Sequence, residues 1–352
     1  MWRETTKHKR NRRIFDEEFE SFLPEKILDF HVHVMNEGVL PAGRTYSCAG
    51  HPIAKYDLDN LAQDLDELYP RRKTSAVCFG FPDVDYDQKC NNDYVARSCN
   101  ERFLGTPSPT QATPASPASS ASQRFFPFRL FDPLHDTPEA LHDDLVAKRF
   151  LGIKPYLNYV RKADPNDVEI REMLPGWVME IADALGLIVM LHIPRKQRLA
   201  DPLNQRQLVE LCQTYPRARI VLAHIGRAYY LKNIAGHLNA LRGLPNLYYD
   251  LAMLNNSEVL EYLFARVPPD RILYATDTPI ALAPGKSVEI NDQYTYITPV
   301  PWELSISDEH KKIVFTAFAY EELRAIKKAV ERLGLERDFI EKIFFSNGMA
   351  LL

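Results

Sequence analysis

Two histidines, His31 and His33, lie one residue apart in the apolar stretch KILDFHVHVM. Side chains on a strand alternate between its two faces, so residues 31 and 33 project to the same side, about 6.5 Å apart along the strand. Two imidazoles placed in this way can converge on one divalent cation, because bonds from histidine nitrogen to zinc are about 2 Å long. The pair therefore predicts a metal-binding strand end.

Polar residues end four further apolar runs: Lys154 in GIKPY, His192 in VMLHIP, His224 in VLAHIG and Asp277 in YATDTP. Taken singly, each has an ordinary interpretation, since a strand-end histidine is usually a hydrogen-bonded core residue, a lysine extends to solvent and an aspartate caps a turn. Ionisable groups at the ends of five apolar strands would be costly to bury unless they satisfy one another or bind a metal. The set as a whole favours a metal site.

Eight short apolar runs supply these strand ends, and most of them are apolar on both faces, as in parallel strands covered by helices. The runs are KILDFHVH, TSAVCFGF, FFPFRLF, FLGIKPY, GLIVMLHI, ARIVLAHI, NLYYDLA and DRILYATD. Amphipathic stretches predict helices over residues 57–69, 138–148, 169–185, 204–215, 257–266 and 310–333. Eight strands alternating with helices predict an α/β fold of the (β/α)8 TIM-barrel type, with its active site at the carboxyl ends of the strands.

Composition narrows the class of protein. The chain has 352 residues, 45% of them hydrophobic and 26% charged, and its net charge of -4 argues against a nucleic-acid binder. No apolar run approaches the ~20 residues that span a bilayer, so we expect no membrane partner. The five cysteines form no CxxC pair, which indicates reduced thiols in a cytoplasmic protein.

We expect one barrel domain over residues 26–352, preceded by an N-terminal extension over 1–25. The extension has no apolar core of a secretory signal, and its basic cluster KHKRNRR is followed at once by acidic DEEFE, as in a solvated terminus. Residues 105–123 are rich in Pro, Ser and Ala and predict a flexible surface insertion.

Together these motifs resemble the amidohydrolase superfamily, in its amidohydrolase-related branch of TIM-barrel metal-dependent hydrolases. DFHVH resembles the first-strand H-x-H of that family, LHIP and LAHIG its histidines on strands five and six, and YATDTP its aspartate on strand eight. The closing IFFSNGMALL is similar to the F-x-x-N-A-x-x-L of its members, and the resemblance extends over residues 26–352.

The resemblance implies a metal centre with His31, His33, His192 and Asp277 as ligands of one divalent ion, with zinc favoured and manganese as the alternative. His224 would then polarise the substrate. In relatives with two ions a carbamylated lysine bridges the metals, and Lys154 occupies that strand position, so Lys154 and His224 would join the ligands of a binuclear centre.

A metal-bound water with a pKa near 7 would attack an amide, lactone or ester, with Asp277 accepting the proton and His224 stabilising the oxyanion. The same residues suit a second outcome that the resemblance implies, the non-oxidative decarboxylation of an aromatic or unsaturated acid. A third interpretation, from a different class, is a metal-free barrel that binds a small ligand without catalysis.

Basic and aromatic residues near the expected mouth indicate a small anionic substrate. The candidates for binding it are Lys154, Tyr156, Tyr159, Arg195 and Arg227. Lys196 and Arg198 are interpreted as ordinary exposed residues. The long segment after Asp277 could form a lid or half of a homodimer contact.

Overall fold

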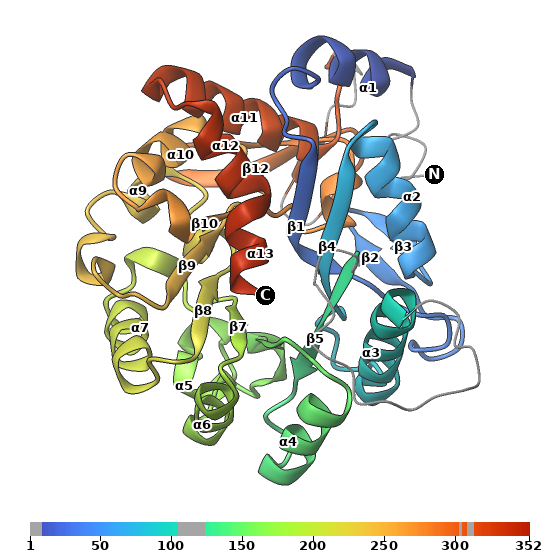
Figure 1. Ribbon diagram of the computed structural model, residues 1–352, viewed down its shortest axis with the longest axis vertical. Coiled ribbons are helices and arrows are strands. Elements are labelled where there is room, and N and C mark those ends of the chain that lie inside the picture. The colour runs from blue at the N-terminus through green and yellow to red at the C-terminus, as the bar shows by residue number, and fades with distance from the viewer. Residues whose placement is uncertain (1–8, 105–123, 303–304, 308–312) are drawn as a thin grey trace.

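The computed structural model describes residues 9–104, 124–302, 305–307 and 313–352 (Figure 1). Eight parallel strands form one sheet in the order β1-β4-β5-β6-β7-β8-β9-β10. Their bounds are β1 Lys26–His33, β4 Lys73–Phe79, β5 Phe125–Phe131, β6 Gly152–Pro155, β7 Ile188–Leu191, β8 Arg219–Leu222, β9 Leu247–Asp250 and β10 Ile272–Leu273. The Phe30 amide donates to the Tyr274 carbonyl oxygen at 3.0 Å across the seam between the first and last strands. The predicted eight-stranded barrel is confirmed.

Helices cover the outside of the barrel (Figure 1). The longer ones are α2 Leu58–Leu68, α3 Gln88–Leu104, α4 Pro138–Ala147, α6 Gly176–Leu185, α7 Pro202–Thr214, α10 Ser257–Phe264 and α11 Phe318–Leu333. Four predicted helices match α2, α4, α7 and α10 to within a few residues. The segment of α3 carried no helix prediction.

Two predicted helices differ from the structure. The stretch 169–185 is two helices, α5 (Ile170–Met173) and α6, because Pro175 cannot continue a helix and Leu174 before it leaves the helical region, with ψ 77°. The stretch 310–333 becomes helical only at Phe318; Ala317 is extended and pairs with Pro284 instead. Residues 310–312 lie outside the described part of the chain.

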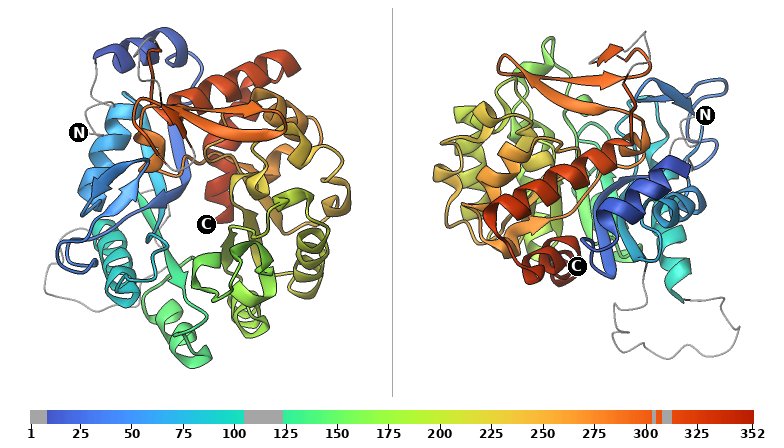
Figure 2. Two further views of the ribbon diagram at one scale, coloured as in Figure 1. Left: turned by 180° about the vertical axis from the view of Figure 1, so that it is seen from behind. Right: turned by 90° about the horizontal axis from the view of Figure 1, so that it is seen from above.

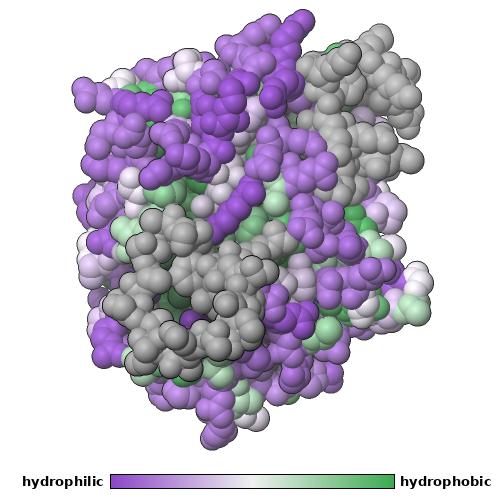
Figure 3. Space-filling view, turned by 45° about the vertical axis from the view of Figure 1, so that its right-hand side comes forward, coloured by the Kyte–Doolittle hydropathy of each residue, from purple (hydrophilic) through white to green (hydrophobic). Residues whose placement is uncertain are grey.

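The barrel interior is a packed apolar core that closes one end. Side chains from alternating strand positions, among them Leu28, Phe30, Phe79 and Met190, fill it, and helix α13 (Asn347–Leu351) lies against it where the strands begin. Gly348 lies so close to Leu28 that a Cβ there would be 2.7 Å from its methyl carbon. Hydrophilic residues dominate the face in Figure 3, so the large apolar side chains lie mostly inside. The interior of the barrel is therefore closed at the end where the strands begin.

A small sheet lies over that other end, on the opposite side of the barrel from α13 (Figure 2, right). It consists of β11 (Lys286–Ile290), β12 (Gln293–Thr298) and β13 (Ser305–Ser307). It is built from the long segment after Asp277, for which we predicted a lid or a dimer contact; either role stays a prediction. A hairpin of β2 (Tyr46–Cys48) and β3 (His51–Ile53) follows β1.

The N-terminal segment packs on the barrel from residue 9 onward. Helix α1 (Lys9–Ile14) runs into a π-helical turn (Phe15–Phe19) whose two phenylalanines are fully buried in the main core. Arg324 holds Glu18 at 2.7 Å. The predicted division at residue 26 stays a prediction, and the predicted insertion 105–123 lies outside the described residues. No helix of the described chain is long and apolar enough to cross a membrane.

Candidate active site

The first-strand histidines meet Asp277 at the open end of the barrel. His31 and His33 end β1, and Asp277 follows β10 in the left-handed backbone region, with φ 69°. The Oδ1 atom of Asp277 lies 3.5 Å from Nε2 of His31 and 3.1 Å from Nε2 of His33. Its Oδ2 atom lies 3.9 Å from Nε2 of His224, which directly follows β8. The structure thus brings together four of the residues that the sequence selected.

The other ring nitrogen of each histidine is already engaged, which fixes its tautomer. Nδ1 of His31 donates to a carboxylate oxygen of Asp250 at 2.9 Å. Nδ1 of His33 donates to the Gly80 carbonyl oxygen at 2.8 Å, and Nδ1 of His224 to that of Ala252 at 2.9 Å. A carbonyl oxygen can only accept, so Nε2 is the ring nitrogen that His33 and His224 can offer to a cation, and the Nε2 atoms of all three rings face Asp277.

These residues fit a divalent ion. Nε2 of His31 is buried without a hydrogen-bond partner among the described residues, as expected of a nitrogen that awaits a metal. Burial lowers the pKa of His31 well below its ordinary value, so its ring is neutral and ready to ligate. Two sets of possible donor atoms lie within 4.8 Å of one another, His31 with His33 and Asp277, and His31 with His224 and Asp250.

The carboxylate of Asp277 is ionised. Burial alone would raise the pKa of Asp277, but the imidazoles of His31, His33 and His224 outweigh this and hold the pKa below its ordinary value. A carboxylate beside three imidazole nitrogens is an arrangement suited to binding a cation and to accepting a proton.

Lys154 at the end of β6 is fully buried, not extended to solvent. Its ammonium nitrogen lies 5.0 Å from the ring centre of Phe79 and 4.9 Å from that of Tyr156, and has no hydrogen-bond partner among the described residues. Burial lowers the pKa of Lys154 to about 7, against the attraction of Asp250 and Asp277. Near neutral pH a large fraction of this amine is therefore uncharged and nucleophilic.

A cavity of about 350 Å³ opens here, and we call it the histidine cavity because His33, His192, His224 and Asp277 line it. Aromatic side chains form much of the remaining wall: Tyr46, Phe81, Tyr156 and Trp302. The ring of His192 lies 5.4 Å from that of His224, between centres. His192 belongs to neither of the two donor sets found among the described residues. It lies in the wall of the cavity, beside the cluster of His31, His33 and Asp277.

The predicted substrate-binding residues divide into two groups. Tyr156 reaches the site, with its hydroxyl 3.1 Å from Nε2 of His33, whereas Tyr159 is buried beside it and is not among the residues that line the histidine cavity. Arg195 forms an ion pair with Asp201 at 2.9 Å and lines a separate surface cavity. The structure therefore does not bring Arg195 to the histidines.

Two arginines lie behind the wall of the site. Arg227 is largely buried, donates to the Ile193 carbonyl oxygen at 3.2 Å, and has a pKa lowered by burial. The prediction that Arg198 is an ordinary exposed residue is wrong: it is half-buried over the ring of Tyr294 at 4.5 Å, and one of its guanidinium nitrogens is buried without a hydrogen-bond partner among the described residues.

A chain of aromatic rings joins the histidine cavity to the small sheet. From His224 the ring centres follow at 5.7 Å to Tyr229 and 4.5 Å to Tyr294. The chain continues at 5.5 Å to Tyr296, on which Trp302 stacks at 4.8 Å with the planes only 7° apart. The small sheet is thus held on the site by ring contacts that end at the cavity wall.

The backbone after β8 forms a turn in the left-handed helical conformation. All four residues of α8 (His224–Arg227) have positive φ, between 53° and 64°. Only glycine adopts this conformation freely, and here only Gly226 is glycine, so the turn is strained at the other three positions. Contacts maintain it: the His224 amide donates to Asp250 at 2.6 Å. Strained backbone persists only where surrounding contacts hold it in place, and such positions are concentrated at functional sites.

A family model described as Amidohydrolase matches residues 29–315. The chain belongs to the amidohydrolase family. No curated protein matches its sequence.

Solved structures place this amidohydrolase among TIM barrels. It resembles a probable 2-pyrone-4,6-dicarboxylic acid hydrolase from Acinetobacter baumannii with citric acid bound, at 14% identity and a TM-score of 0.56, over 92% of this chain and 98% of that one. It also resembles 5-carboxyvanillate decarboxylase from Sphingomonas paucimobilis, at 13% identity and a TM-score of 0.50, over 93% of this chain and 99% of that one. A third similar structure is 4-oxalomesaconate hydratase from Rhodopseudomonas palustris, at 16% identity and a TM-score of 0.52, over 92% of this chain and 95% of that one. At these identities the likeness establishes the fold.

Sequence reasoning missed one residue of the amidohydrolase centre. Asp250 ends β9 in NLYYDLA and binds both Nδ1 of His31 and the amide of His224. The signal was present, because Asp250 is an ionisable residue at the carboxyl end of an apolar strand, like the other residues selected. Its role is to orient two imidazoles, as carboxylates behind metal-binding histidines commonly do.

We expect Asp250→Asn to weaken zinc binding about 10- to 100-fold. The amide oxygen would keep the backbone amides of His224 and Ala252, so the new NH₂ group would donate to Nδ1 of His31 and move the ring hydrogen to Nε2. Competition with a chromophoric chelator measures the dissociation constant. Asp292→Asn is the control, since Asp292 is exposed and pairs with Lys232. Zinc affinity within threefold of the parent would contradict the orienting role.

Proposed function

We propose that this amidohydrolase is a metal-dependent hydrolase that cleaves an amide, lactone or ester bond of a small anionic molecule. The main support for this proposal is that the Nε2 atoms of His31 and His33 lie 3.5 and 3.1 Å from the same carboxylate oxygen of Asp277. In addition, the buried Nε2 of His31 has no hydrogen-bond partner among the described residues. A buried nitrogen with no partner is costly, and a cation would satisfy it.

His31, His33, His192 and Asp277 would hold one ion, with zinc first and manganese as the alternative. Lys154 and His224 would join them if a second ion binds, and the lowered pKa of Lys154 supports its reactivity in that case. A bound divalent ion would polarise a carbonyl group and lower the pKa of a water molecule toward 7.

Two residues of the chain would move protons. Asp277 is ionised and borders the cavity, so it would accept a proton from the attacking water and pass it to the leaving group. His224 donates through Nδ1 to Ala252, so its Nε2 can stabilise an oxyanion only after it takes up a proton. The carboxylate of Asp277, whose Oδ2 lies 3.9 Å from Nε2 of His224, would pass that proton to His224.

The charge around the cavity supports an anionic substrate. Arg227 and Arg198 lie behind its wall, and ion pairs engage neither of them in the described part of the chain. Arginine binds carboxylates through a planar pair of donors, which suits this class of substrate.

Decarboxylation of an aromatic acid is the second candidate, and the aromatic wall of the cavity favours it. Tyr46, Phe81, Tyr156 and Trp302 could stack on an aromatic ring. Asp277 would first take up a proton from water and then deliver it to the ring carbon as the bond from that carbon to the departing CO₂ breaks. None of the five cysteines forms a disulfide bond among the described residues, and reduced thiols support the proposal of a cytoplasmic enzyme.

A screen of lactones, N-acyl compounds and hydroxybenzoate-type acids, with zinc or manganese supplied, tests the proposal. We expect release of a carboxylic acid without CO₂, whereas CO₂ release would select the second candidate. Elemental analysis of the same samples should give close to one ion per chain. Below about 0.2 ion per chain in supplemented buffer, together with no turnover, the metal-free ligand-binding barrel would replace both.

A further inference from the structure

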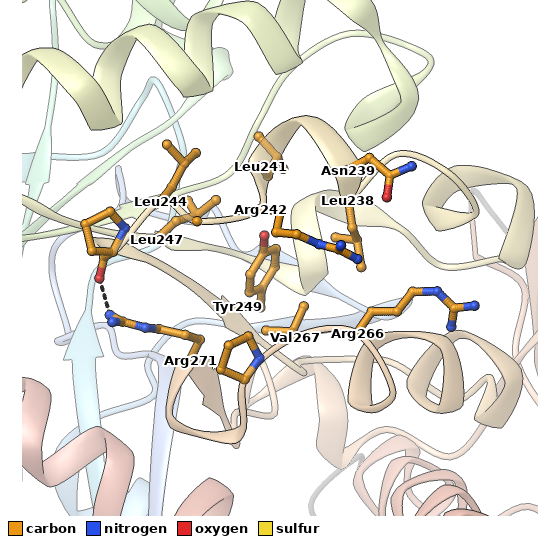
Figure 4. Close-up of a pocket in the computed structure, with 13 residues that line it drawn as sticks. Leu238, Asn239, Leu241, Arg242, Leu244, Leu247, Tyr249, Arg266, Val267 and Arg271 are labelled. Carbon is orange, nitrogen blue, oxygen red and sulfur yellow. Dashed lines mark hydrogen bonds between the residues drawn. The ribbon is translucent and has the colours of Figure 1, made fainter.

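A second cavity, of about 470 Å³, lies where β9 and β10 begin, against the outer side of β9 (Figure 4). The segments that form it precede these two strands, whereas His224 and Asp277 follow strands, so the two cavities lie at opposite ends of the barrel. Its wall is mainly apolar: Leu238, Leu241, Leu244, Leu247 and Val267. Cavities of this size and composition commonly bind small molecules.

The hydroxyl of Tyr249 faces this cavity, at the end of a largely buried side chain. Tyr249 is only 4% exposed, and Figure 4 shows its ring at the centre of the cavity with the hydroxyl directed toward Leu241 and Arg242. No residue in the described ranges forms a hydrogen bond with this hydroxyl. A ligand group that accepts a hydrogen bond from this hydroxyl would find a donor already directed into the cavity.

Three arginines lie at the rim, so we call this the arginine-rimmed cavity: Arg242, Arg266 and Arg271. No aspartate or glutamate lines it. Arg271 donates to the Pro245 carbonyl oxygen and lies 3.7 Å from Asp270. Arg266 stacks on the Tyr262 ring at 3.7 Å.

Arg242 differs from the other two arginines. It is exposed, and no described residue forms an ion pair or hydrogen bond with its side chain. The guanidinium of Arg242 is therefore available to a ligand, and its single positive charge suits a ligand with one negative charge.

We propose that the arginine-rimmed cavity binds a small amphipathic monocarboxylate. Its apolar body lies among the leucines and Val267, and its carboxylate accepts hydrogen bonds from Arg242 and the Tyr249 hydroxyl. The apolar wall excludes a strongly hydrated ligand such as free phosphate, and the missing acidic residues exclude a cation. This site uses no residue of the histidine cavity and stands independently of the reaction proposed there.

Decanoate is the probe, titrated calorimetrically into the full-length, zinc-loaded protein. We expect saturable binding with one site at this cavity and a dissociation constant below about 1 mM. Arg242→Ala should weaken binding about tenfold because it removes a charge-assisted hydrogen bond. Tyr249→Phe should weaken it about threefold to tenfold while keeping the packing of the ring.

Two controls make the result specific. Arg161→Ala removes an exposed arginine that lies outside the cavity and should leave decanoate binding unchanged. Decylamine, which has the same chain and the opposite charge, should not bind. Circular dichroism melts of each variant verify folding.

Three results would overturn the proposal: no saturation by 10 mM decanoate, affinity unchanged by both Arg242→Ala and Tyr249→Phe, or affinity lowered by Arg227→Ala instead. The last result would assign the ligand to the histidine cavity.

Discussion

Asp277→Asn should lower turnover about 10³-fold while the barrel stays folded. Asparagine has the same shape but cannot accept a proton from water, and it removes the negative charge that lies 3.1 Å from His33 and 3.5 Å from His31. The measurement is kcat on the substrate identified by the screen, under saturating zinc. Saturation separates loss of the proton acceptor from loss of the metal.

The control is Asp292→Asn, which removes an exposed carboxylate paired with Lys232 at 3.0 Å. Its turnover should stay within about twofold of the parent, because exposed pairs contribute little. Turnover of Asp277→Asn within tenfold of the parent, with metal bound in both proteins, would exclude Asp277 as the proton acceptor.

Asp136→Asn should lower the free energy of unfolding by about 3 kcal/mol. Arg129 on β5 is nearly buried, and its guanidinium binds both carboxylate oxygens of Asp136 at 2.7 and 2.8 Å, and Asp144 on α4 at 2.8 Å. Losing one partner leaves a buried cation only partly compensated, which costs more than a surface pair contributes. Urea unfolding followed by circular dichroism measures the change.

The matched control is Glu25→Gln, because Glu25 and its partner Lys73 have side chains 69% and 73% exposed. It should leave the urea midpoint almost unchanged, because an exposed pair contributes little. An effect of Asp136→Asn as small as that would show that Asp144 alone compensates Arg129.

The same network makes stability depend on pH. Burial would raise the pKa of Asp144, but Lys148 and Arg129 outweigh it and hold the pKa below its ordinary value. A folded pKa below the unfolded value of about 3.9 means that the contribution is present above that pH and is lost as the pH falls through the folded pKa. Between about pH 5 and 3 the parent should therefore lose more stability than Asp144→Asn. Equal losses in the two proteins would contradict this.

The strands and their polar ends could be predicted because they follow from local pattern. Apolar runs buried on both faces are typical of parallel strands, and each ionisable residue that ends such a run stands out against it. His31, His33, His224 and Asp277 were found in this way, and the structure gathers them although Asp277 lies 246 positions after His31. Barrel closure brings the strand ends together.

Other features depend on tertiary contacts that local pattern does not contain. Asp250 was overlooked because its importance lies in the two groups it binds, on β1 and after β8. The α3 segment has scattered polar residues. Asn91 and Asn92 among them are buried because their amides donate to backbone carbonyl oxygens just after β1 and on β5. Arg198 looked exposed because the Tyr294 ring that covers it comes from β12, about a hundred residues away.

The position of Trp302, stacked on Tyr296 at the histidine cavity, should make the fluorescence of the protein sensitive to ligand binding. Indole emission depends on the polarity around the ring, and Trp302 borders the histidine cavity, whereas Trp177 packs against Phe131 on the outside of the barrel. A molecule that enters the cavity changes the surroundings of Trp302 and leaves those of Trp177 unaffected, while Trp2 lies outside the described residues. The chain therefore carries its own fluorescent reporter of occupancy, which reads binding without any chemical turnover or added label.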